Sequence, residues 1–254
     1  MDQEALTGMG SDKKFLSIIC ATKNATDIEK LLISYESQKT IDTEFIVIDS
    51  CNANDSSIIY NNYQHRIDKL LVQQDRSIYE AWNKGINLAN GVFVCFVGAD
   101  DVIANGVIAK LISIIKSQYS IDYIYGYNVM TLNGSPHAII GRKYSPDILE
   151  NYMPMAHVMS AHRKTWLVSN GGFDESYRSS GDYDFFLRVR SSMHIVETKI
   201  IFAYVEEGGI SRKTTLPIYE SFRAKQKHGV NFLKSVIWLI RGLAGHYARR
   251  LCAK

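Results

Sequence analysis

The sequence predicts an α/β protein whose mostly parallel sheet is flanked by helices. Through the first half of the chain, short apolar runs rich in β-branched residues alternate with stretches in which apolar residues recur at helical spacing. Each run is apolar at nearly every position, which is typical of strands covered on both faces in a parallel sheet. The chain of 254 residues is 46% hydrophobic, so it can bury a sizeable core.

The predicted elements follow one another in a regular order. The strands are predicted at 15–22, 43–50, 92–101 and 121–130. The helices are predicted at 25–38, 77–91 and 105–118. The second helix ends at Asn90 and Gly91, a typical C-terminal stop. The residues predicted on the inner faces of the three helices are Ile28, Leu31, Leu32 and Tyr35, then Ile78, Ala81, Trp82 and Ile86, and finally Ile108, Leu111, Ile112 and Ile115.

The second half of the chain is less regular. A polar loop precedes a helix predicted from about Gly181, with Phe185, Phe186 and Val189 as packing residues and Asp182 in the first turn. From Asn231 the chain predicts a basic amphipathic helix. Its apolar face comprises Phe232, Val236, Leu239, Ile240 and Leu243, and its charges are Lys234, Arg241, Arg249, Arg250 and Lys254. We therefore expect a polar extension at 1–14, the main domain at 15–228 and this C-terminal helical tail at 229–254.

Composition excludes several classes of protein. A formal charge of +3 is too small to indicate nucleic-acid binding. The four cysteines form no CxxC pair, which favours reduced core thiols over a zinc site or a disulfide framework; they are Cys20, Cys51, Cys95 and Cys252. Residues 1–14 lack the apolar segment of a secretory signal, and no apolar run reaches the roughly 18 residues of a membrane span. We expect a cytoplasmic protein.

Two adjacent carboxylates follow the predicted strand at 92–101. Asp100 and Asp101 lie at the carboxyl end of that strand, as Thr22 and Asp49 do for two others, and in parallel sheets such ends share one crevice. Two buried carboxylates repel unless a cation holds them, and oxygen ligands without a cysteine or histidine cluster suit Mg²⁺ or Mn²⁺. The alternative is a solvated turn with a carboxylate N-cap for the next helix.

Several segments, in order, resemble the family 2 glycosyltransferases of the GT-A fold, the inverting type of bacterial surface-polysaccharide synthesis. The segments are LSIICATKN, FIVIDSCNANDSS, QQDRSIYEAWNKGINLANGVFVCFVGADD, MAHVMSAHRK, GGFDESYRSSGDYDFFLRV and VEEGGIS. They extend from about Phe15 to Ser211, and the long block before Asp101 is the most specific. The resemblance implies a Rossmann-like sheet, a nucleotide-sugar donor and a DxD-type metal motif.

The resemblance also implies roles for individual residues at the donor site. Ala21, Thr22 and Asp49 would line the nucleobase and ribose pocket with Asp75 nearby, Asn83 and Lys84 would orient the donor, and Asp100 would face ribose or sugar hydroxyls. Asp101 would bind the metal that bridges the diphosphate. His157 would contact the diphosphate or the acceptor, or form a hydrogen-bonded wall of the pocket; both interpretations stay open.

Asp182 matches the catalytic carboxylate of the family, which takes the proton from the acceptor hydroxyl. Gly181 stands before it where many relatives have Glu, so the assignment rests on Asp182 and the following DFFLR. Asp184 points to another face of the same helix, and we expect it to be structural and paired with Arg188 one turn later. Ser50 and Lys23 depart from the usual acid or glycine and the usual aromatic residue, which leaves the nucleobase open.

The remaining polar and aromatic residues divide between surface and core. His162 and Arg163 are expected at the surface. Trp82 and Trp166 are expected in the core, because large aromatic side chains contribute mainly buried area. Glu206 and Glu207 precede two glycines, and either approach the metal or a flexible lid or simply flank a turn.

The function predicted from these residues is transfer of a sugar from a nucleotide-sugar, with a UDP-sugar the expected donor, to a saccharide or lipid-linked saccharide in surface-polysaccharide or lipopolysaccharide synthesis. The cofactor would be Mn²⁺ or Mg²⁺. The C-terminal helix would bind the inner face of the cytoplasmic membrane peripherally, or a second subunit. Two alternatives remain: a sugar nucleotidyltransferase, which lacks support because no glycine-rich basic loop lies near the N-terminus, and a non-catalytic carbohydrate-binding protein.

Overall fold

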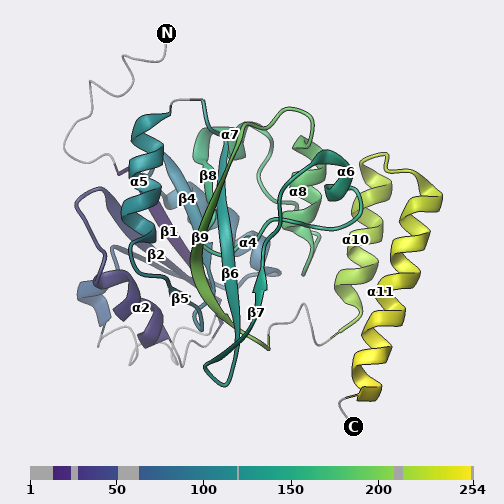
Figure 1. The fold of residues 1–254 in the computed structure, drawn as a ribbon. Coiled ribbons are helices and arrows are strands. Elements are labelled where there is room, and N and C mark those ends of the chain that lie inside the picture. Colours follow the sequence, from purple (N-terminus) through teal and green to yellow (C-terminus); the bar gives the residue numbers. More distant parts are fainter. Residues whose placement is uncertain (1–13, 24–27, 51–62, 119, 209–213, 253–254) are drawn as a thin grey trace.

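The computed structural model describes residues 14–23, 28–50, 63–118, 120–208 and 214–252. Within them the chain forms one nine-stranded sheet with helices on both faces and a helical hairpin at one side (Figure 1). The strands are β1 Leu16–Thr22, β2 Thr43–Asp49, β3 Lys69–Val72, β4 Phe93–Val97, β5 Val102–Ile103, β6 Tyr123–Leu132, β7 Ser135–Ile140, β8 Ala161–Arg163 and β9 Ile195–Glu206. The helices are α2 Ile28–Glu36, α4 Ile78–Leu88, α5 Val107–Ser117, α6 Pro146–Leu149, α7 Lys164–Ser169, α8 Gly181–Val189, α10 Leu216–Lys227 and α11 Phe232–Cys252, with a 3₁₀ turn η1 at Gln64–Arg66.

The sheet has a parallel half and a mixed half. Its order is β3-β2-β1-β4-β8-β6-β9-β5, with β7 paired to β6. The first four strands in this order are mutually parallel, as the alternating pattern predicts. Beyond them β8 runs antiparallel to both β4 and β6, and β9 is parallel to β6. The parallel half thus ends at β4, the strand that leads to Asp100 and Asp101.

Alternation along the central strands divides the core into two layers. In β1, Leu16, Ile18 and Cys20 pack toward α2 and α5, whereas Ile19 and Ala21 pack on the opposite face with α4. The second layer also contains Phe185 and Phe186 of α8. Cys20 and Cys95 are buried free thiols, as predicted, while Cys51 lies outside the described residues.

The helical predictions hold with one exception inside α4. The four predicted inner residues of α2 and those of α5 are all buried, but Ile78 of α4 is 41% exposed. The side chain of Ser77 accepts a hydrogen bond from the backbone N–H of Glu80 and so caps the N-terminus of α4. Ile78 therefore lies in the first turn of the helix, at the carboxyl edge of the sheet and beyond the strands that cover the rest of α4. The short edge strand β3, which begins with Lys69 and is only half-buried, carries no strong apolar pattern, and the sequence did not predict it.

The C-terminal hairpin of α10 and α11 packs beside α8 (Figure 1). At Gly242 a Cβ atom would lie 2.9 Å from Cγ2 of Ile218, so glycine permits the close approach of the two helices. The predicted apolar face of α11 packs only in part: Val236, Leu239 and Leu243 are half-buried, whereas Phe232 and Ile240 are 65% and 60% exposed. Ser235 and His246, which were not predicted on this face, are buried. The helix α11 is apolar on two sides. One side packs against α10, and the other is exposed. No helix in the described part of the chain is long and apolar enough to cross a membrane.

Candidate active site

Three carboxylates, Asp49, Asp100 and Asp101, lie at the carboxyl ends of β2 and β4, the two strands that flank β1. Thr22 and Asp49 are paired in register, and the backbone N–H of Ser50 donates to the carbonyl of Thr22 at 2.9 Å. Burial raises the pKa of the Cys20 thiol, and the charges of Asp101, Asp100 and Asp49 raise it further. Because β2 and β4 are the parallel neighbours of β1, the structure places these carboxylates on the same edge of the sheet.

Of the two adjacent acids, Asp101 is the buried one, and Asp49 is fully buried as well. Asp101 is 3% exposed, and its Oδ2 accepts a hydrogen bond of 2.6 Å from the backbone N–H of Gly98. Burial raises the pKa of Asp101 to about 7, the Gly98 N–H opposes this, and Asp100 adds to it. The anionic form is therefore disfavoured unless a cation binds beside it. The N-cap interpretation is wrong, because the N-cap residue of α5 is Gly106 and no side chain caps the helix.

The two adjacent acids share the space above Gly98. A Cβ atom at Gly98 would lie 2.9 Å from Oδ1 of Asp100 and 3.2 Å from Oδ2 of Asp101. No three His, Cys, Asp or Glu residues converge on a metal position within the described ranges. Two carboxylates suit a hard divalent ion whose remaining ligands are water and phosphate oxygens, so the donor set fits Mg²⁺ or Mn²⁺ bound together with a diphosphate.

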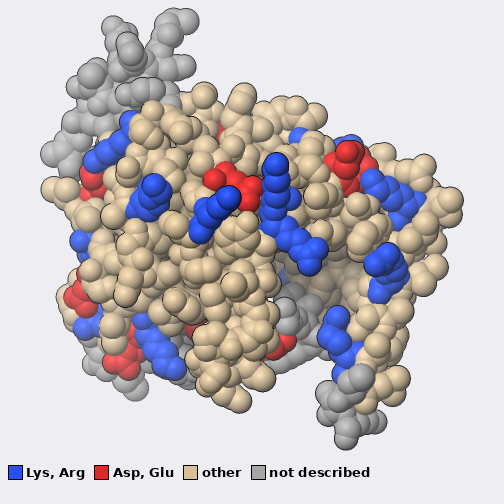
Figure 2. Space-filling view, viewed as in Figure 1, with Lys and Arg blue, Asp and Glu red and all other residues tan. Residues whose placement is uncertain are grey.

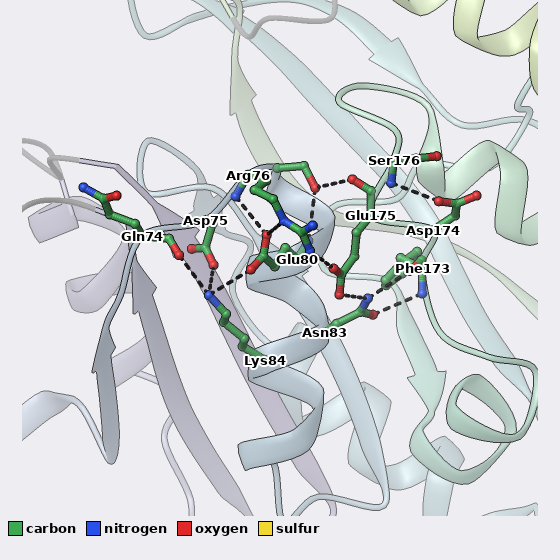
Figure 3. A network of polar contacts seen from close by, with 11 residues as sticks. Gln74, Asp75, Arg76, Glu80, Asn83, Lys84, Phe173, Asp174, Glu175 and Ser176 are labelled. Atoms are coloured by element: carbon green, nitrogen blue, oxygen red, sulfur yellow. Dashed lines mark hydrogen bonds and ion pairs between the residues drawn. The ribbon is translucent and has the colours of Figure 1, made fainter.

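The residues predicted to orient the donor form a polar network between α4 and the loop before α8 (Figure 3). Lys84 donates to the carboxylate of Asp75 and, at 3.1 Å, to the carbonyl of Gln74. Asn83 donates from Nδ2 to Phe173 O at 2.9 Å and to Glu175 Oε1 at 3.1 Å, and its Oδ1 accepts from Phe173 N. The amide of Asn83 thus holds the 173–175 loop. Oδ2 of Asp75 is buried without a hydrogen-bond partner in the described part of the chain.

Asp182 lies in the first turn of α8, as predicted, and is half-buried. Its Oδ1 accepts a hydrogen bond of 3.1 Å from the hydroxyl of Tyr79 on α4. Gly181 packs directly against the Tyr79 ring, where a Cβ atom would lie 2.8 Å from the ring carbons. This contact gives a physical reason for the glycine that departs from the family pattern.

A buried carboxylate from α10 holds the loop that leads into α8. Glu220 accepts backbone N–H groups of Arg178, Ser179 and Ser180 at 2.9, 2.8 and 2.9 Å. Ser180 itself makes no side-chain cap, so Glu220 satisfies groups at the start of the helix that carries Asp182. The sequence offered no signal for this role, because an acid within a polar helix normally faces solvent.

His157 forms part of an aromatic cluster beside Asp182. Its ring stacks on Trp82 with centroids 4.9 Å apart and on Phe96 at 5.7 Å. Burial lowers the pKa of His157, against the opposing charge of Asp182, so the imidazole is neutral near pH 7. Nε2 makes no hydrogen bond to any described residue. Trp82 and Trp166 are core residues, as predicted.

His162 is buried, and its predicted surface position is wrong. The side chain is fully enclosed, with ring centroids 4.7 Å from Tyr123 and 5.4 Å from Phe96, and burial lowers its pKa well below the usual value. It lies on β8, an interior strand between β4 and β6, so alternate residues must enter the core. Arg163 is half-buried, and its Nε donates to Ile121 O at 2.6 Å.

Asp184 has the structural role predicted for it. It is fully buried and contacts Arg188 at 3.6 Å, Lys227 at 3.1 Å and His228 at 2.9 Å. These contacts tie α8 to the end of α10.

Glu206 ends β9 and Glu207 follows it, and both contact the β6–β7 hairpin. Glu206 accepts from Thr131 Oγ1 and Asn133 N, each at 2.6 Å, while Glu207 pairs with His137 at 3.0 Å. Of the two interpretations, flanking a turn fits these contacts. The residues from 209 to 213 that follow lie outside the described ranges.

Similar proteins identify the class. The model of Glycosyl transferase family 2 matches residues 17–175, more than half of the chain. A PGL/p-HBAD biosynthesis glycosyltransferase of Mycobacterium bovis (strain BCG / Pasteur 1173P2) is 27% identical over 207 residues, covering 77% of this chain and 78% of that protein. The O-antigen biosynthesis protein RfbC of Myxococcus xanthus is 23% identical over 209 residues, covering 77% of this chain and 16% of that one.

Solved structures agree in fold. Staphylococcus aureus TarS 1–349 in complex with UDP-GlcNAc superposes with a TM-score of 0.67 at 20% identity, covering 92% of this chain and 73% of that one. The mannosyltransferase PcManGT of Pyrobaculum calidifontis, in complex with GDP-Man and Mn²⁺, gives 0.59 at 13% identity, covering 95% and 78%. The protein is a glycosyltransferase with a GT-A-type fold. It belongs to glycosyl transferase family 2.

Proposed function

We propose that this protein transfers a sugar from a nucleotide-sugar, with a UDP-sugar as donor, to a saccharide or lipid-linked saccharide of the cell surface, using Mn²⁺ or Mg²⁺. The observation that carries the proposal is the grouping of Asp49, Asp100 and Asp101 around the end of β1. Solved neighbours in complex with UDP-GlcNAc or with GDP-Man and Mn²⁺ support this donor chemistry. The matched relatives named for PGL/p-HBAD and O-antigen biosynthesis support a cell-surface product.

At the donor side, Asp101 would hold the divalent ion, and the adjacent Asp100 would face ribose or sugar hydroxyls. The ion would offset the negative charge that grows on the leaving nucleoside diphosphate. Ala21, Thr22, Asp49 and Asp75 would line the nucleoside pocket, where carboxylates accept from ring N–H groups or ribose hydroxyls. Asn83 and Lys84 would act indirectly, by holding Asp75 and the 173–175 loop in place.

At the acceptor side, Asp182 would act as general base. The acceptor oxygen forms its bond to the anomeric carbon as the bond from that carbon to the diphosphate oxygen breaks, and the hydroxyl proton passes to Asp182. A single direct displacement inverts the anomeric configuration. His157 lies within electrostatic reach of Asp182 and stacks on Phe96 of β4, the strand that leads to Asp100 and Asp101. The aromatic cluster would therefore connect the base to the donor site.

Calorimetric titration tests the donor site. UDP, GDP, CDP and dTDP are titrated with and without Mn²⁺, and one of them should bind in a metal-dependent way. Asp101→Ala should abolish the metal dependence, whereas Asp182→Asn should retain binding and lose transfer. Binding of none of the four would contradict the proposal. Release of pyrophosphate from a nucleoside triphosphate would instead identify a nucleotidyltransferase. Sugar binding that does not depend on metal or nucleotide would identify a carbohydrate-binding protein.

The outer side of α11 supports a second proposal, contact with an anionic membrane surface. Five exposed apolar residues repeat every three, four or seven positions and so form one outer stripe: Leu233, Ile237, Ile240, Tyr247 and Leu251. The helix contains Lys234, Arg241, Arg249 and Arg250 and no Asp or Glu. Basic side chains predominate on the visible side of the α10–α11 hairpin (Figure 2). A second copy would place like charges opposite one another, whereas anionic lipid headgroups complement them.

Vesicle flotation distinguishes the two partners of the outer stripe. The protein should float with vesicles that contain phosphatidylglycerol and not with vesicles of phosphatidylcholine alone. The double variant Ile237→Glu/Ile240→Glu should remain unbound, while Ile139→Glu, at an exposed position on β7, should bind normally. Equal flotation of both variants would contradict membrane contact. Light scattering that shows a dimer which the double variant loses would assign the stripe to a second subunit.

A further inference from the structure

A cavity of about 310 Å³ lies between α8 and the α10–α11 hairpin, and Asp182 forms part of its wall. The hairpin contributes Phe222 and Lys225 from α10 and Trp238 and Leu239 from α11. The volume lies at the lower end of the range typical of small-molecule sites. The inner face of α11, which the sequence did not separate from its outer stripe, thus closes a space beside the proposed base.

The cavity combines an aromatic wall with hydroxyl groups. Trp238 and Tyr152 line it with ring centroids 5.5 Å apart, and both side chains are half-buried. Apolar aromatic faces of this kind pack against the C–H face of a sugar ring. Four hydroxyl groups also line the cavity, those of Ser179, Ser180, Ser221 and Ser235. Ser180 and Ser235 already donate to Pro217 O and Asn231 O, but a purely hydrocarbon occupant would still exclude water from the Asp182 carboxylate.

The cavity is poorly suited to a phosphate. Its lining includes one cation, Lys225, among the residues that the structure describes. Nζ of Lys225 already donates to the carbonyl of Asn151 at 2.8 Å. Burial, with the nearby charge of Lys234, lowers the pKa of Lys225 to about 8, so its cationic form is less stable than that of an exposed lysine. The Asp182 carboxylate in the same wall would repel a phosphate.

We propose that this cavity binds the saccharide acceptor, with the sugar ring against Trp238 and Tyr152 and its reacting hydroxyl toward Asp182. The inference rests on the proposed function, because it assigns a substrate class to the acceptor side of the same site. It adds α11 to the substrate-binding elements and makes Trp238 a residue that contacts the acceptor.

Fluorine NMR tests the binding directly. The chain has three tryptophans, and Trp82 and Trp166 are core residues, so incorporation of 5-fluorotryptophan gives a resonance for Trp238 that Trp238→Phe identifies by its loss. Methyl glycosides of glucose, galactose, mannose and N-acetylglucosamine are titrated in the presence of UDP and Mn²⁺. At least one should shift the Trp238 resonance saturably. Absence of a shift with all four, while UDP still binds, would overturn the acceptor site and leave the proposed function standing.

Kinetics supply an independent readout. Trp238→Ala should raise the acceptor KM by about tenfold, because it removes the stacking surface, and Trp238→Phe should restore most of the affinity. In Trp238→Ala the KM for the donor should change far less than the KM for the acceptor. An unchanged acceptor KM in Trp238→Ala would overturn the inference, whereas loss of nucleotide binding in the wild-type protein would instead remove the proposed function on which it rests.

Discussion

The hydroxyl of Tyr79 donates a hydrogen bond of 3.1 Å to Oδ1 of Asp182, joining α4 to the first turn of α8. Burial raises the pKa of Tyr79 well above its usual value, and the charge of Asp182 adds to this effect, so the hydroxyl keeps its proton near neutral pH. The Tyr79 hydroxyl therefore occupies Oδ1 of Asp182 and leaves the other carboxylate oxygen to receive a proton.

The first prediction concerns this hydrogen bond. Tyr79→Phe should lower kcat by about tenfold, because the loss of a hydrogen bond to a charged group leaves Asp182 less well oriented. The affinity for nucleotide and metal should not change. Initial rates and calorimetry measure the two quantities. Tyr35→Phe is the matched control, since it removes a buried hydroxyl bonded to Thr43 on the other face of the sheet. An equal loss of kcat in both variants would contradict a specific role for Tyr79.

The second prediction concerns the space between the paired carboxylates. Gly98→Ala should weaken metal-dependent nucleotide binding by about tenfold or more, because the new methyl group would lie within 3.2 Å of both Asp100 and Asp101 in a close-packed site. Binding measured without metal should change little. Gly245→Ala, at an open position on α11, is the control and should bind nucleotide normally. Retention of full metal dependence in Gly98→Ala would argue against a cation above Gly98.

The third prediction concerns the buried contacts of Asp184. Asp184→Ala should lower the free energy of unfolding by about 3 kcal/mol or more, because it removes the acceptor of Lys227 and His228 from a fully buried position. Urea denaturation measures the loss. Asp42→Ala breaks the exposed pair with Lys116 and should cost less than about 1 kcal/mol. If the two losses were similar, Asp184 would not anchor α8.

The fourth prediction is a pH dependence that belongs to Lys225. Its pKa is about 8 in the folded protein against an ordinary value of 10.5, so between these values the unfolded chain binds more protons. The stability contributed by this residue must then rise with pH through that window, by at most about 1.4 kcal/mol per pH unit. The difference in unfolding free energy between the wild type and Lys225→Met should increase from below pH 8 to near pH 10.5. A flat difference would show that Lys225 is not desolvated.

Much of the fold, and the position of the carboxylates at the ends of strands, could be predicted because apolar periodicity and strand ends are local properties of the sequence. Ile28 and Leu31 on one helix, or Asp49 and Asp101 behind two strands, are visible in single segments. His162 and Glu220 were not predictable in this way, because a histidine on an interior antiparallel strand and an acid that accepts three distant N–H groups depend on neighbours far along the chain. The residue-by-residue roles at the donor site stay predictions.

Glu220 also bears on where this protein can be shortened. A chain that ended before α10 would leave three backbone N–H groups of the 178–180 segment without their acceptor and would release Asp184 from His228. The smallest piece that keeps Asp182 in place must therefore extend through residue 228, although the stretch matched by the family model stops at 175. The helix α10, although it lies beyond the matched stretch, thus helps to set the position of the proposed base.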